Sequence, residues 1–407
     1  MITYDFNYYL SPTTSSIDVS IKDTQGNNFI IHTGLFIRPD MWDSYRQRPL
    51  NIYLKKYKKL NTRLDKLRVF IGEYLLKIET DKISAVRRKL TSRMQRFLQE
   101  GDLENSGDGF LIKMLEYINS REHLICKSTH RRYRVFYNLM HRYEGSIRKK
   151  LAIEDVNALF VRDFLTFGLA ENYSESTLHR SIEFIKTILN FLERRGIRTF
   201  VYELSFSKKR EMEPIITLTA HEIKQIEQAS IPSDLHIARD WLIVSCYTGQ
   251  RISDFMRFDD STIASFQGRL CVSFIQQKTK KKLVLPLHPV INKILAQYEN
   301  KFPPKLPAQK YNMQIKQVAR LSGIDEVLKK RKRIGHRAEF CTVAKWEAVT
   351  SHIGRRSFAT NFYGKIPTAL LMQATGHSTE LMLKKYIGEM NSEMVSQLGE
   401  FFDKQLK

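Results

Sequence analysis

The chain has 407 residues, of which 42% are hydrophobic and 27% are charged, with only 18 Gly and 11 Pro. This composition is typical of folded domains and excludes collagen-like, low-complexity and disordered chains. The length predicts roughly two to three domains. Lysine and arginine number 66 against 43 acidic residues, which gives a formal net charge of +23. A protein this basic most often binds a polyanion, either a nucleic acid or an anionic membrane surface.

The sequence does not favour a membrane or a metal as partner. No apolar run approaches the roughly 20 residues that a membrane span requires, and the first residues lack the pattern of a secretory signal. The four cysteines have no C-x-x-C spacing, so they predict reduced thiols in a cytoplasmic protein rather than disulfides or a zinc site. We therefore expect no membrane, no metal and no cofactor, and nucleic acid as the main partner.

The first hundred residues predict a small sheet followed by a basic helix. Residues 17–22 alternate apolar and polar side chains, residues 25–28 form a turn signal, and residues 29–37 are again strand-like. From Leu54 onward, apolar residues recur every three or four positions among many lysines, which is typical of an amphipathic helix. We expect a compact first domain over residues 1–100.

Two polar segments predict the domain boundaries. Residues 99–109 concentrate Gly, Asp, Asn and Ser, as linkers do. The helical pattern after them predicts a second domain over residues 107–205. A second boundary is expected within 205–213, where lysine and arginine cluster. The third domain would then cover residues 213–407.

The third domain is expected to be mainly helical. Thr219 and Glu222 have the spacing of a capping box, which predicts a helix beginning there. Two strand-like runs, 270–276 and 283–287, interrupt the helical pattern. The whole chain is therefore predicted to be a multidomain α+β protein, mainly α with small β-sheets.

Two basic residues of this domain have spacings that suit phosphate chemistry. Arg251 follows a helix–Gly turn that would hold its guanidinium rigidly, and this planar group matches two phosphate oxygens. A surface ion pair is the commoner role for such an arginine. Lys278 lies between the two strand-like runs, where a hairpin tip would bring an ammonium to a reacting oxygen. A solvated charged turn that prevents edge-to-edge aggregation is the alternative.

Four residues further along the chain complete the pattern. His352 and Arg355 are three positions apart, so on a helix they share one face. His377 follows a glycine, and Tyr386 lies nine residues beyond it. A single tyrosine near the end of a chain is usually a core or interface residue. In this order, however, the groups supply every part of a metal-free attack on a phosphodiester: a nucleophile, proton donors and acceptors, and guanidiniums for the phosphate oxygens.

At this point the sequence resembles the tyrosine recombinases, or lambda-type phage integrases. The motifs read Thr-Gly-Gln-Arg251, Gln-Lys278-Thr, His352-Ile-Gly-Arg355, Gly-His377 and Lys-Tyr386-Ile. The resemblance extends to the rest of the chain, although less specifically. Residues 1–100 resemble the arm-type DNA-binding module of integrases from Bacteroides-like mobile elements, and residues 107–205 resemble a helical, SAM-like core-binding domain.

The resemblance implies a mechanism and a set of roles. Tyr386 would attack the scissile phosphate to form a 3′-phosphotyrosyl bond, and Arg251 and Arg355 would stabilise the transition state. Lys278 would protonate the leaving 5′-oxygen. His352 would assist proton transfer, and a non-bridging oxygen would be bound by His377. The covalent bond conserves the energy of the phosphodiester, so neither ATP nor a metal is required.

The resemblance also implies the partners. Double-stranded attachment sites would be held in a clamp by a homotetramer, with a host DNA-bending protein or an excisionase as further candidates. Two alternatives remain: a type IB-like topoisomerase, which reseals the same strand, and a catalytically inactive DNA-binding architectural protein. Further basic residues are candidates for DNA-backbone contacts, with solvated charges or ion pairs as the alternative. They are Arg131, Arg132, Arg134, Lys280, Lys329, Lys330, Arg331 and Arg356.

Overall fold

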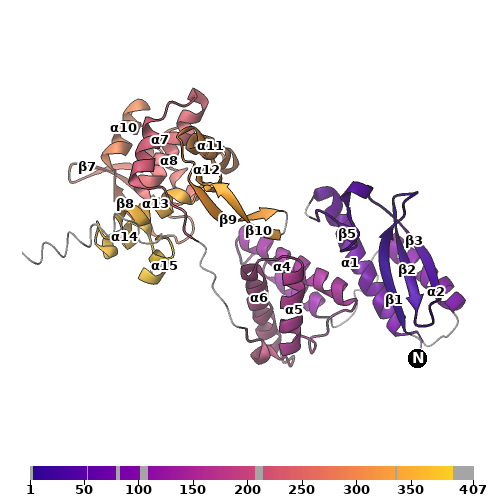
Figure 1. Ribbon diagram of the computed structural model, residues 1–407. Helices are drawn as coiled ribbons and strands as arrows, with labels where there is room; N and C mark the ends of the chain where they lie inside the picture. Colours follow the sequence, from indigo (N-terminus) through magenta and orange to yellow (C-terminus); the bar gives the residue numbers. More distant parts are fainter. Residues whose placement is uncertain are drawn as a thin grey trace, which may run out of the picture. The chain divides into compact units, whose positions relative to one another are not determined.

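The structure is a computed structural model that describes residues 3–52, 54–78, 83–100, 109–206, 214–334 and 337–387. Its internal contacts divide the chain into two compact units (Figure 1). The first unit comprises Met1–Lys209 with Lys332–Glu339, and the second comprises Arg210–Arg331 with Phe340–Lys407. Each unit is mainly helical and carries small antiparallel sheets, which confirms the predicted α+β class.

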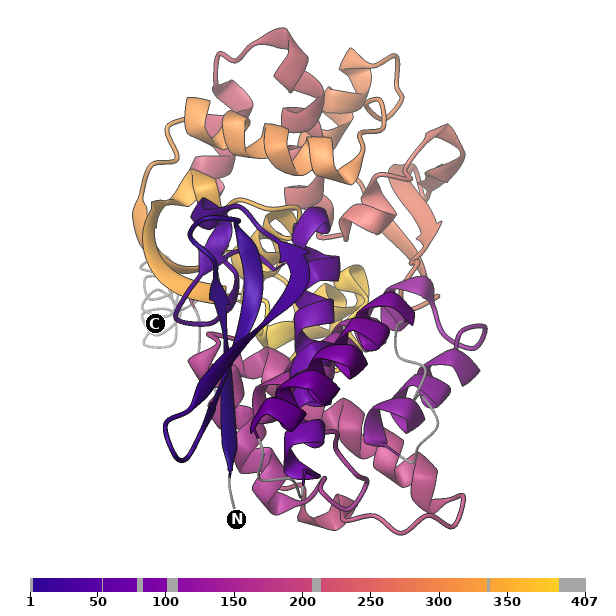
Figure 2. The same ribbon diagram turned by 90° about the vertical axis from the view of Figure 1, so that its right-hand side faces the viewer.

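The first unit begins with a three-stranded antiparallel sheet in the order β1-β2-β3. Its strands are β1 (Tyr4–Leu10), β2 (Ser16–Asp23) and β3 (Asn28–Phe36). Side chains along β3 alternate strictly between exposed and buried, because successive residues of a strand point to opposite faces. The buried face packs on two helices that follow it in the chain (Figure 2). These are α1 (Lys55–Leu76) and α2 (Ile83–Glu100).

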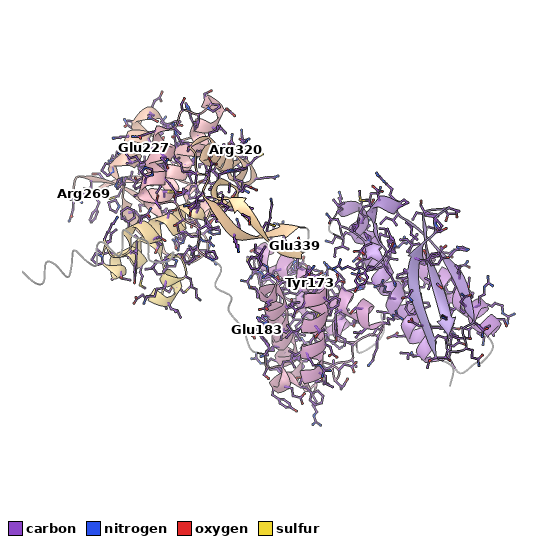
Figure 3. All side chains as sticks on the ribbon, in the orientation of Figure 1. Tyr173, Glu183, Glu227, Arg269, Arg320 and Glu339 are labelled. Carbon is purple, nitrogen blue, oxygen red and sulfur yellow. The ribbon has the colours of Figure 1, made fainter. Side chains whose placement is uncertain are left out.

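A separate hydrophobic cluster holds the four helices that follow. They are α3 (Phe110–Ser120), α4 (Lys127–Ile147), α5 (Ala158–Ala170) and α6 (Glu175–Glu193). Ser174 caps α6 by accepting a hydrogen bond from the amide of Thr177. Tyr173 precedes this helix and Glu183 lies within it (Figure 3). The unit also contains two short 3-10 helices, η1 (Pro39–Met41) and η2 (Val201–Glu203), and a two-stranded antiparallel sheet of β4 (Trp42–Asp43) and β5 (Arg48–Pro49).

The sheet and the four-helix cluster meet within the first unit where α1 packs on α4. Arg148, at the end of α4, pairs with Asp5 of β1, and its guanidinium lies 4.3 Å from the centre of the Phe6 ring. Gly72 of α1 permits this approach, since a Cβ at that position would lie 2.2 Å from the Arg148 carbonyl oxygen. The division of this unit at residues 99–109 stays a prediction, because 101–108 lie outside the described residues.

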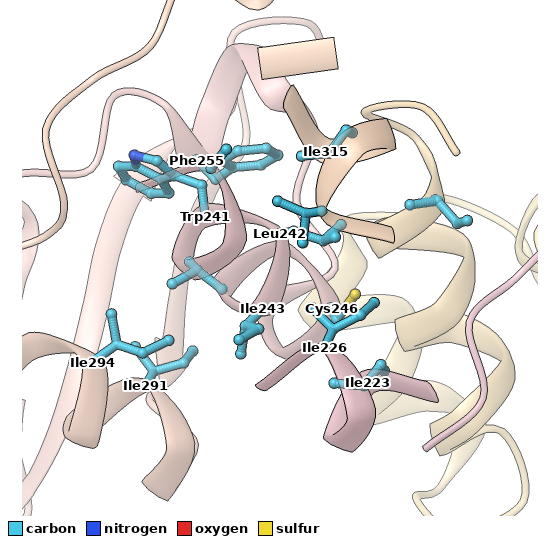
Figure 4. Close-up of a cluster of buried hydrophobic side chains, with 14 of the residues drawn as sticks. Ile223, Ile226, Trp241, Leu242, Ile243, Cys246, Phe255, Ile291, Ile294 and Ile315 are labelled. Carbon is cyan, nitrogen blue, oxygen red and sulfur yellow. The ribbon is translucent and has the colours of Figure 1, made fainter. Parts of the chain in front are cut away.

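The second unit is built around α8 (His236–Thr248), which is buried on nearly all sides. Trp241, Leu242, Ile243 and Cys246 of this helix contact apolar residues from the surrounding elements (Figure 4). The other helices are α7 (Ala220–Gln228), α9 (Ile252–Phe255), α10 (Pro289–Gln297), α11 (Ala308–Leu321), α12 (Lys345–Ala348), α13 (Ile353–Phe362), α14 (Thr368–Thr375) and α15 (Glu380–Lys384). Two single turns, η3 (Ser233–Leu235) and η4 (Asp260–Thr262), join them.

Two small sheets accompany these helices. The first has the order β6-β7-β8, with β6 (Ile263–Phe266), β7 (Arg269–Ile275) and β8 (Lys282–Pro286). The second pairs β9 (Val327–Ile334) with β10 (Arg337–Ala344). The register of β7 against β8 places Ile275 opposite Lys282. Residues 276–281 therefore form the tip of a hairpin, as the two strand-like runs predict.

Other local predictions can be compared with the structure. Thr219 and Glu222 form the predicted capping box at the start of α7. The β9–β10 hairpin is not predicted, because the basic run 329–333 lacks the alternation of apolar and polar residues that identifies a strand. Arg355 lies on α13 as expected, whereas His352 occupies the N-cap position just before that helix. Residues 392–407 carry apolar side chains at helical spacing, which predicts packing on their own domain or on a neighbouring protomer. They lie outside the described residues.

Candidate active site

Arg355 occupies the centre of the site. Its side chain is fully buried, and its Nη1 donates a hydrogen bond of 2.9 Å to the carbonyl oxygen of Gly249. Gly249 ends α8 in the left-handed conformation, with φ of +66°, and this turn leaves its carbonyl available to accept. Gly354, which precedes Arg355 in the chain, lets α13 approach α8 closely, because a Cβ at that position would lie 1.9 Å from Ser245 Oγ. Close helix packing therefore fixes the position of the guanidinium.

His377 and Tyr386 lie against this arginine. Nη2 of Arg355 is 2.8 Å from Nε2 of His377, and Nδ1 of the same ring is 2.8 Å from Thr375 Oγ1. Because a guanidinium only donates, Nε2 accepts and the proton of the imidazole is on Nδ1. The half-buried Tyr386 ring lies 4.8 Å from the His377 ring and 5.2 Å from the Arg355 guanidinium. Protein groups thus engage both nitrogens of His377, and a bond from this ring to a phosphate oxygen would require release of Arg355.

His352 lies within a field of cations. Burial lowers the pKa of His352, and the charges of Arg356, Arg355, Arg251 and Lys278 lower that pKa further. The charges of these four cations therefore disfavour protonation of the imidazole. His352 is neutral at pH 7 and able to accept a proton.

The same physics acts on His377. Burial, together with the charges of Arg355, Arg251 and Lys281, lowers the pKa of His377 to about 4. Burial also lowers the pKa of Arg355, and the neighbouring Arg251 lowers it further, whereas Tyr386 raises it. The charges of the two guanidiniums repel each other, so a negative charge between them would be favourable.

Some donors of the two arginines have no partner among the described residues. Nη1 of Arg251 and Nε of Arg355 are buried, and no hydrogen bond to either atom is present in that part of the chain. Buried donors normally find acceptors. Donors of this kind on paired guanidiniums suit an oxyanion with several oxygens, such as a phosphodiester. The structure thus brings together Arg251, Arg355, His352, His377 and Tyr386, with Lys278 close enough to influence His352.

The further basic candidates are distributed over both units. Arg356 belongs to the site, because its charge lowers the pKa of His352 more than any other charge does. Lys280 lies at the hairpin tip in the left-handed conformation. In β9, Lys329 is exposed, Lys330 donates to the carbonyl oxygen of Ala348, and Arg331 stacks on Phe340. On α4 of the first unit, Arg131 and Arg132 are exposed, and Arg134 donates to Asn119. Their contacts with DNA stay a prediction.

Sequence reasoning missed several residues around the site. Lys281 influences His377 and its Nζ lies 3.3 Å from Ser378 Oγ, although no motif singles it out from the neighbouring lysines. Gln250 and Gln276 are fully buried beneath the site, and nothing in a glutamine's neighbours reveals its burial. From the sequence, Asp254 is equally well interpreted as an exposed helix charge or as a residue that orients the Arg251 turn. Asp254 is buried, and its carboxylate accepts from the amide of Gln277.

In the described part of the chain, no group of three or more His, Cys, Asp or Glu side chains could hold a metal ion. None of the four cysteines forms a disulfide bond. Among the described residues, no helix combines the length and the apolar character that a membrane crossing requires.

The fold is that of the tyrosine recombinases. An integrase of the transposon Tn1549, solved with a circular-intermediate DNA, matches 72% of this chain and 99% of its own with a TM-score of 0.55 at 13% identity. A lambda integrase tetramer on a Holliday junction matches 92% of this chain and 96% of its own, with a TM-score of 0.50 at 17% identity. The recombinase XerH on a palindromic difH substrate matches 84% and 95%, with a TM-score of 0.52 at 11% identity.

The sequence comparison identifies the family of the second unit. Residues 217–393 match the profile of the phage integrase family. Together with the fold, this makes the protein a site-specific tyrosine recombinase, a DNA strand-breaking and rejoining enzyme. A comparison with curated protein sequences gives no match.

Proposed function

We propose that this recombinase acts as an integrase in which Tyr386 forms a covalent bond to the 3′-phosphate of a cleaved DNA strand. The observation that carries the proposal is the convergence of Tyr386, Arg355 and His377, with ring and guanidinium centres 4.8 to 5.2 Å apart. Their arrangement beside donors with no described partner fits a phosphodiester bound at this point.

Each candidate side chain is suited by its position and charge to one step of DNA cleavage. The phenolic oxygen of Tyr386 forms the new bond to phosphorus while the bond from phosphorus to the 5′-oxygen breaks. The proton of the phenol passes to neutral His352, and Lys278 supplies a proton to the leaving 5′-oxygen. Arg251 and Arg355 stabilise the charge that develops on the non-bridging oxygens. A 5′-hydroxyl from a partner strand reverses these steps and rejoins the DNA.

His377 has a role that differs from the one its motif implies. In the structure its Nε2 accepts from Arg355, and its Nδ1 donates to Thr375. We assign His377 the function of orienting Arg355, which is itself aimed by the Gly249 carbonyl on the opposite side. A direct bond from His377 to a phosphate oxygen stays the alternative.

The partners follow from the chemistry of recombination. Two duplexes exchange two strands each, so four protomers with one Tyr386 each are required, and the matched lambda integrase is described as a tetramer on a Holliday junction. The substrate is a pair of double-stranded attachment sites held in a clamp, and a host DNA-bending protein or an excisionase would complete the assembly. The formal charge of +23 suits extensive contact with DNA backbones. We place the reaction in the cytoplasm.

The Tyr386→Phe variant tests the proposal directly. A suicide substrate, nicked so that the cleaved fragment dissociates, traps the covalent adduct on a denaturing gel. The variant should form no adduct while binding the same DNA, because only a hydroxyl is removed. Tyr363→Phe serves as the matched control, since Tyr363 ends α13 beyond the site residues and should form normal adducts. Adducts in the Tyr386→Phe variant would refute the assignment of the nucleophile.

A second pair of assays separates the alternatives. A type IB-like topoisomerase relaxes supercoiled DNA without exchanging partners, whereas an integrase joins two sites on separate molecules. An inactive architectural protein forms no adduct at all. We expect adducts and recombinant products from the wild type. Relaxation with no recombinant from any paired sites would favour the topoisomerase.

A further inference from the structure

Two buried glutamines meet directly beneath the site. Gln250 precedes Arg251, and Gln276 lies at the start of the hairpin tip that carries Lys278. Both side chains have 0% exposure, although Gln277 and Lys278, which follow Gln276, are exposed. A buried amide is stable only when its donors and acceptor are bonded. The partners of these two amides therefore show which segments they hold together.

Both polar atoms of the Gln276 side-chain amide are hydrogen-bonded. Its Nε2 donates to Gln250 Oε1 at 3.0 Å and to the carbonyl oxygen of Thr375 at 3.2 Å. Its Oε1 accepts from the hydroxyl of Thr279 at 2.5 Å. Thr279 comes immediately after Lys278 in the chain, so this last bond fixes the loop one residue from the ammonium-bearing side chain.

Gln250 completes the connection on the other side. Its Nε2 donates to the carbonyl oxygens of Thr248 and Ala374, at 2.7 and 2.9 Å. The two amides thus link three segments that are remote in sequence: the turn before Arg251, the hairpin tip with Lys278, and the turn before His377. The separation between Gln276 and Thr375 is 99 residues.

The hairpin tip is also closed by backbone hydrogen bonds. The amide of Gln276 donates to the carbonyl oxygen of Lys281, and the amide of Lys280 donates to the carbonyl oxygen of Gln276. Asp254, on α9, accepts from the amide of Gln277 at 2.8 Å. Lys278 is therefore held in a short closed loop that is attached to the rest of the site at adjacent residues, so its position depends on those attachments.

The space around Gln276 leaves little freedom. A Cβ on Gly376 would lie 2.5 Å from Gln276 Oε1, and Gly376 has a φ of +72° that a side chain would strain. Replacement of Gln276 by an apolar residue would leave the Thr375 carbonyl oxygen and Gln250 Oε1 without their donor in the interior. The loop would then lose its attachment to the other two segments, while the catalytic side chains themselves would be unchanged.

We propose that Gln276 is a positioning residue that fixes the Lys278 loop relative to the Arg251 and His377 turns, and so controls protonation of the leaving 5′-oxygen. This inference rests on the proposed function, in which Lys278 is the general acid. The side-chain amide of Gln276 would affect a single step, the transfer of a proton from Lys278 to the leaving 5′-oxygen. A residue that merely stabilised the domain would affect every step of the reaction.

A sulfur-substituted substrate distinguishes those two roles. In a 5′-bridging phosphorothiolate the leaving atom is sulfur, and a thiolate leaves without being protonated. With ordinary DNA, Gln276→Ala should slow single-turnover cleavage by about 10- to 100-fold at saturating protein, as a misplacement of about 1 Å does. With the sulfur substrate its rate should return to within about threefold of the wild type, as the Lys278→Ala rate should, because leaving-group protonation is no longer required.

Three further variants make the outcome decisive. Thr279→Val removes only the bond from an exposed residue to Gln276, so it should show a smaller defect of the same kind even if Gln276→Ala fails to fold. Gln277→Ala changes an exposed side chain of the same loop and should cleave both substrates normally. Arg355→Ala should stay slow on both substrates, because its role concerns the phosphate oxygens.

The possible failures can be told apart. If the sulfur substrate rescues Lys278→Ala but neither Gln276→Ala nor Thr279→Val, the inference about Gln276 is wrong and the proposed function stands. If it fails to rescue Lys278→Ala, the assignment of the general acid is wrong, and the inference falls with it. If cleavage of ordinary DNA by folded Gln276→Ala and by Thr279→Val equals that of the wild type, the positioning role is refuted.

Discussion

Acid should destabilise the second unit through His377. Burial and neighbouring cations lower the pKa of His377 to about 4 in the folded protein, whereas an unfolded histidine has a pKa of about 6.5. Above pH 6.5 both states are neutral and His377 has no effect on stability. As the pH falls further, the unfolded chain binds a proton that the folded site does not, so folding free energy is lost progressively down to about pH 4.

The size of the effect follows from the same shift. A difference of about 2.5 pKa units corresponds to about 3 kcal/mol when fully expressed. At pH 4.5 the loss is incomplete, and solvent screens part of the repulsion from the exposed Lys281. We therefore expect His377 to contribute a loss of about 2 kcal/mol between pH 7 and pH 4.5. His352 acts in the same direction, since burial and its cationic neighbours also lower its pKa.

Urea unfolding at several pH values measures this loss. The chain has three tryptophans, and in a Trp42→Phe background the remaining two, Trp241 and Trp346, both report on the second unit. His377→Gln removes the titrating group but keeps an amide that can accept from Arg355 and donate to Thr375. Its stability should fall less steeply with acid than that of the parent. His221→Gln, at an exposed position on α7, should leave the parent slope unchanged. Equal slopes for the parent and His377→Gln would refute the reasoning.

Two other substitutions test the electrostatics and the packing of the site. Arg356→Gln removes the charge that contributes most to the lowered pKa of His352, so the pKa of His352 should rise. The acid limb of the cleavage-rate profile should then move to higher pH. A profile that stayed in place or moved to lower pH would contradict this. Gly354→Ala places a methyl group 1.9 Å from Ser245 Oγ, so urea unfolding should show a loss of about 2 kcal/mol, as overpacking costs in other cores. Adding Ser245→Ala should recover part of that loss, and wild-type stability of Gly354→Ala would show that α8 and α13 separate easily.

Local structure was largely predictable from the sequence because its causes lie within a few residues. The capping box of Thr219 and Glu222 depends on a spacing of three, and it is present at the start of α7. The hairpin that carries Lys278 is predicted by two strand-like runs with a polar tip between them. The β9–β10 hairpin was not predicted, because a strand made of lysine and arginine lacks the alternating pattern from which strands are recognised.

The sequence predicts a set of candidate site residues but not their arrangement. The order and chemistry of the side chains single out Arg251, Lys278, His352, Arg355, His377 and Tyr386 as candidates. Their contacts are not predicted, and the acceptor role of His377 toward Arg355 emerges only from the distance of 2.8 Å between the two side chains. The buried glutamines carried no signal at all, because a glutamine in a polar stretch is usually exposed.

The amino-acid sequence by itself determined which chemical groups this recombinase possesses and most of the helices and turns that present them, since turn geometry and helical periodicity arise between neighbouring residues. Only the tertiary structure decided which of those groups meet. The hydrogen bond from Arg355 to Gly249 joins residues 106 positions apart, and it exists because α8 and α13 pack closely in one hydrophobic core. Burial in that core also sets the protonation states of His352 and His377, because the cost of placing a charge there depends on everything that surrounds it.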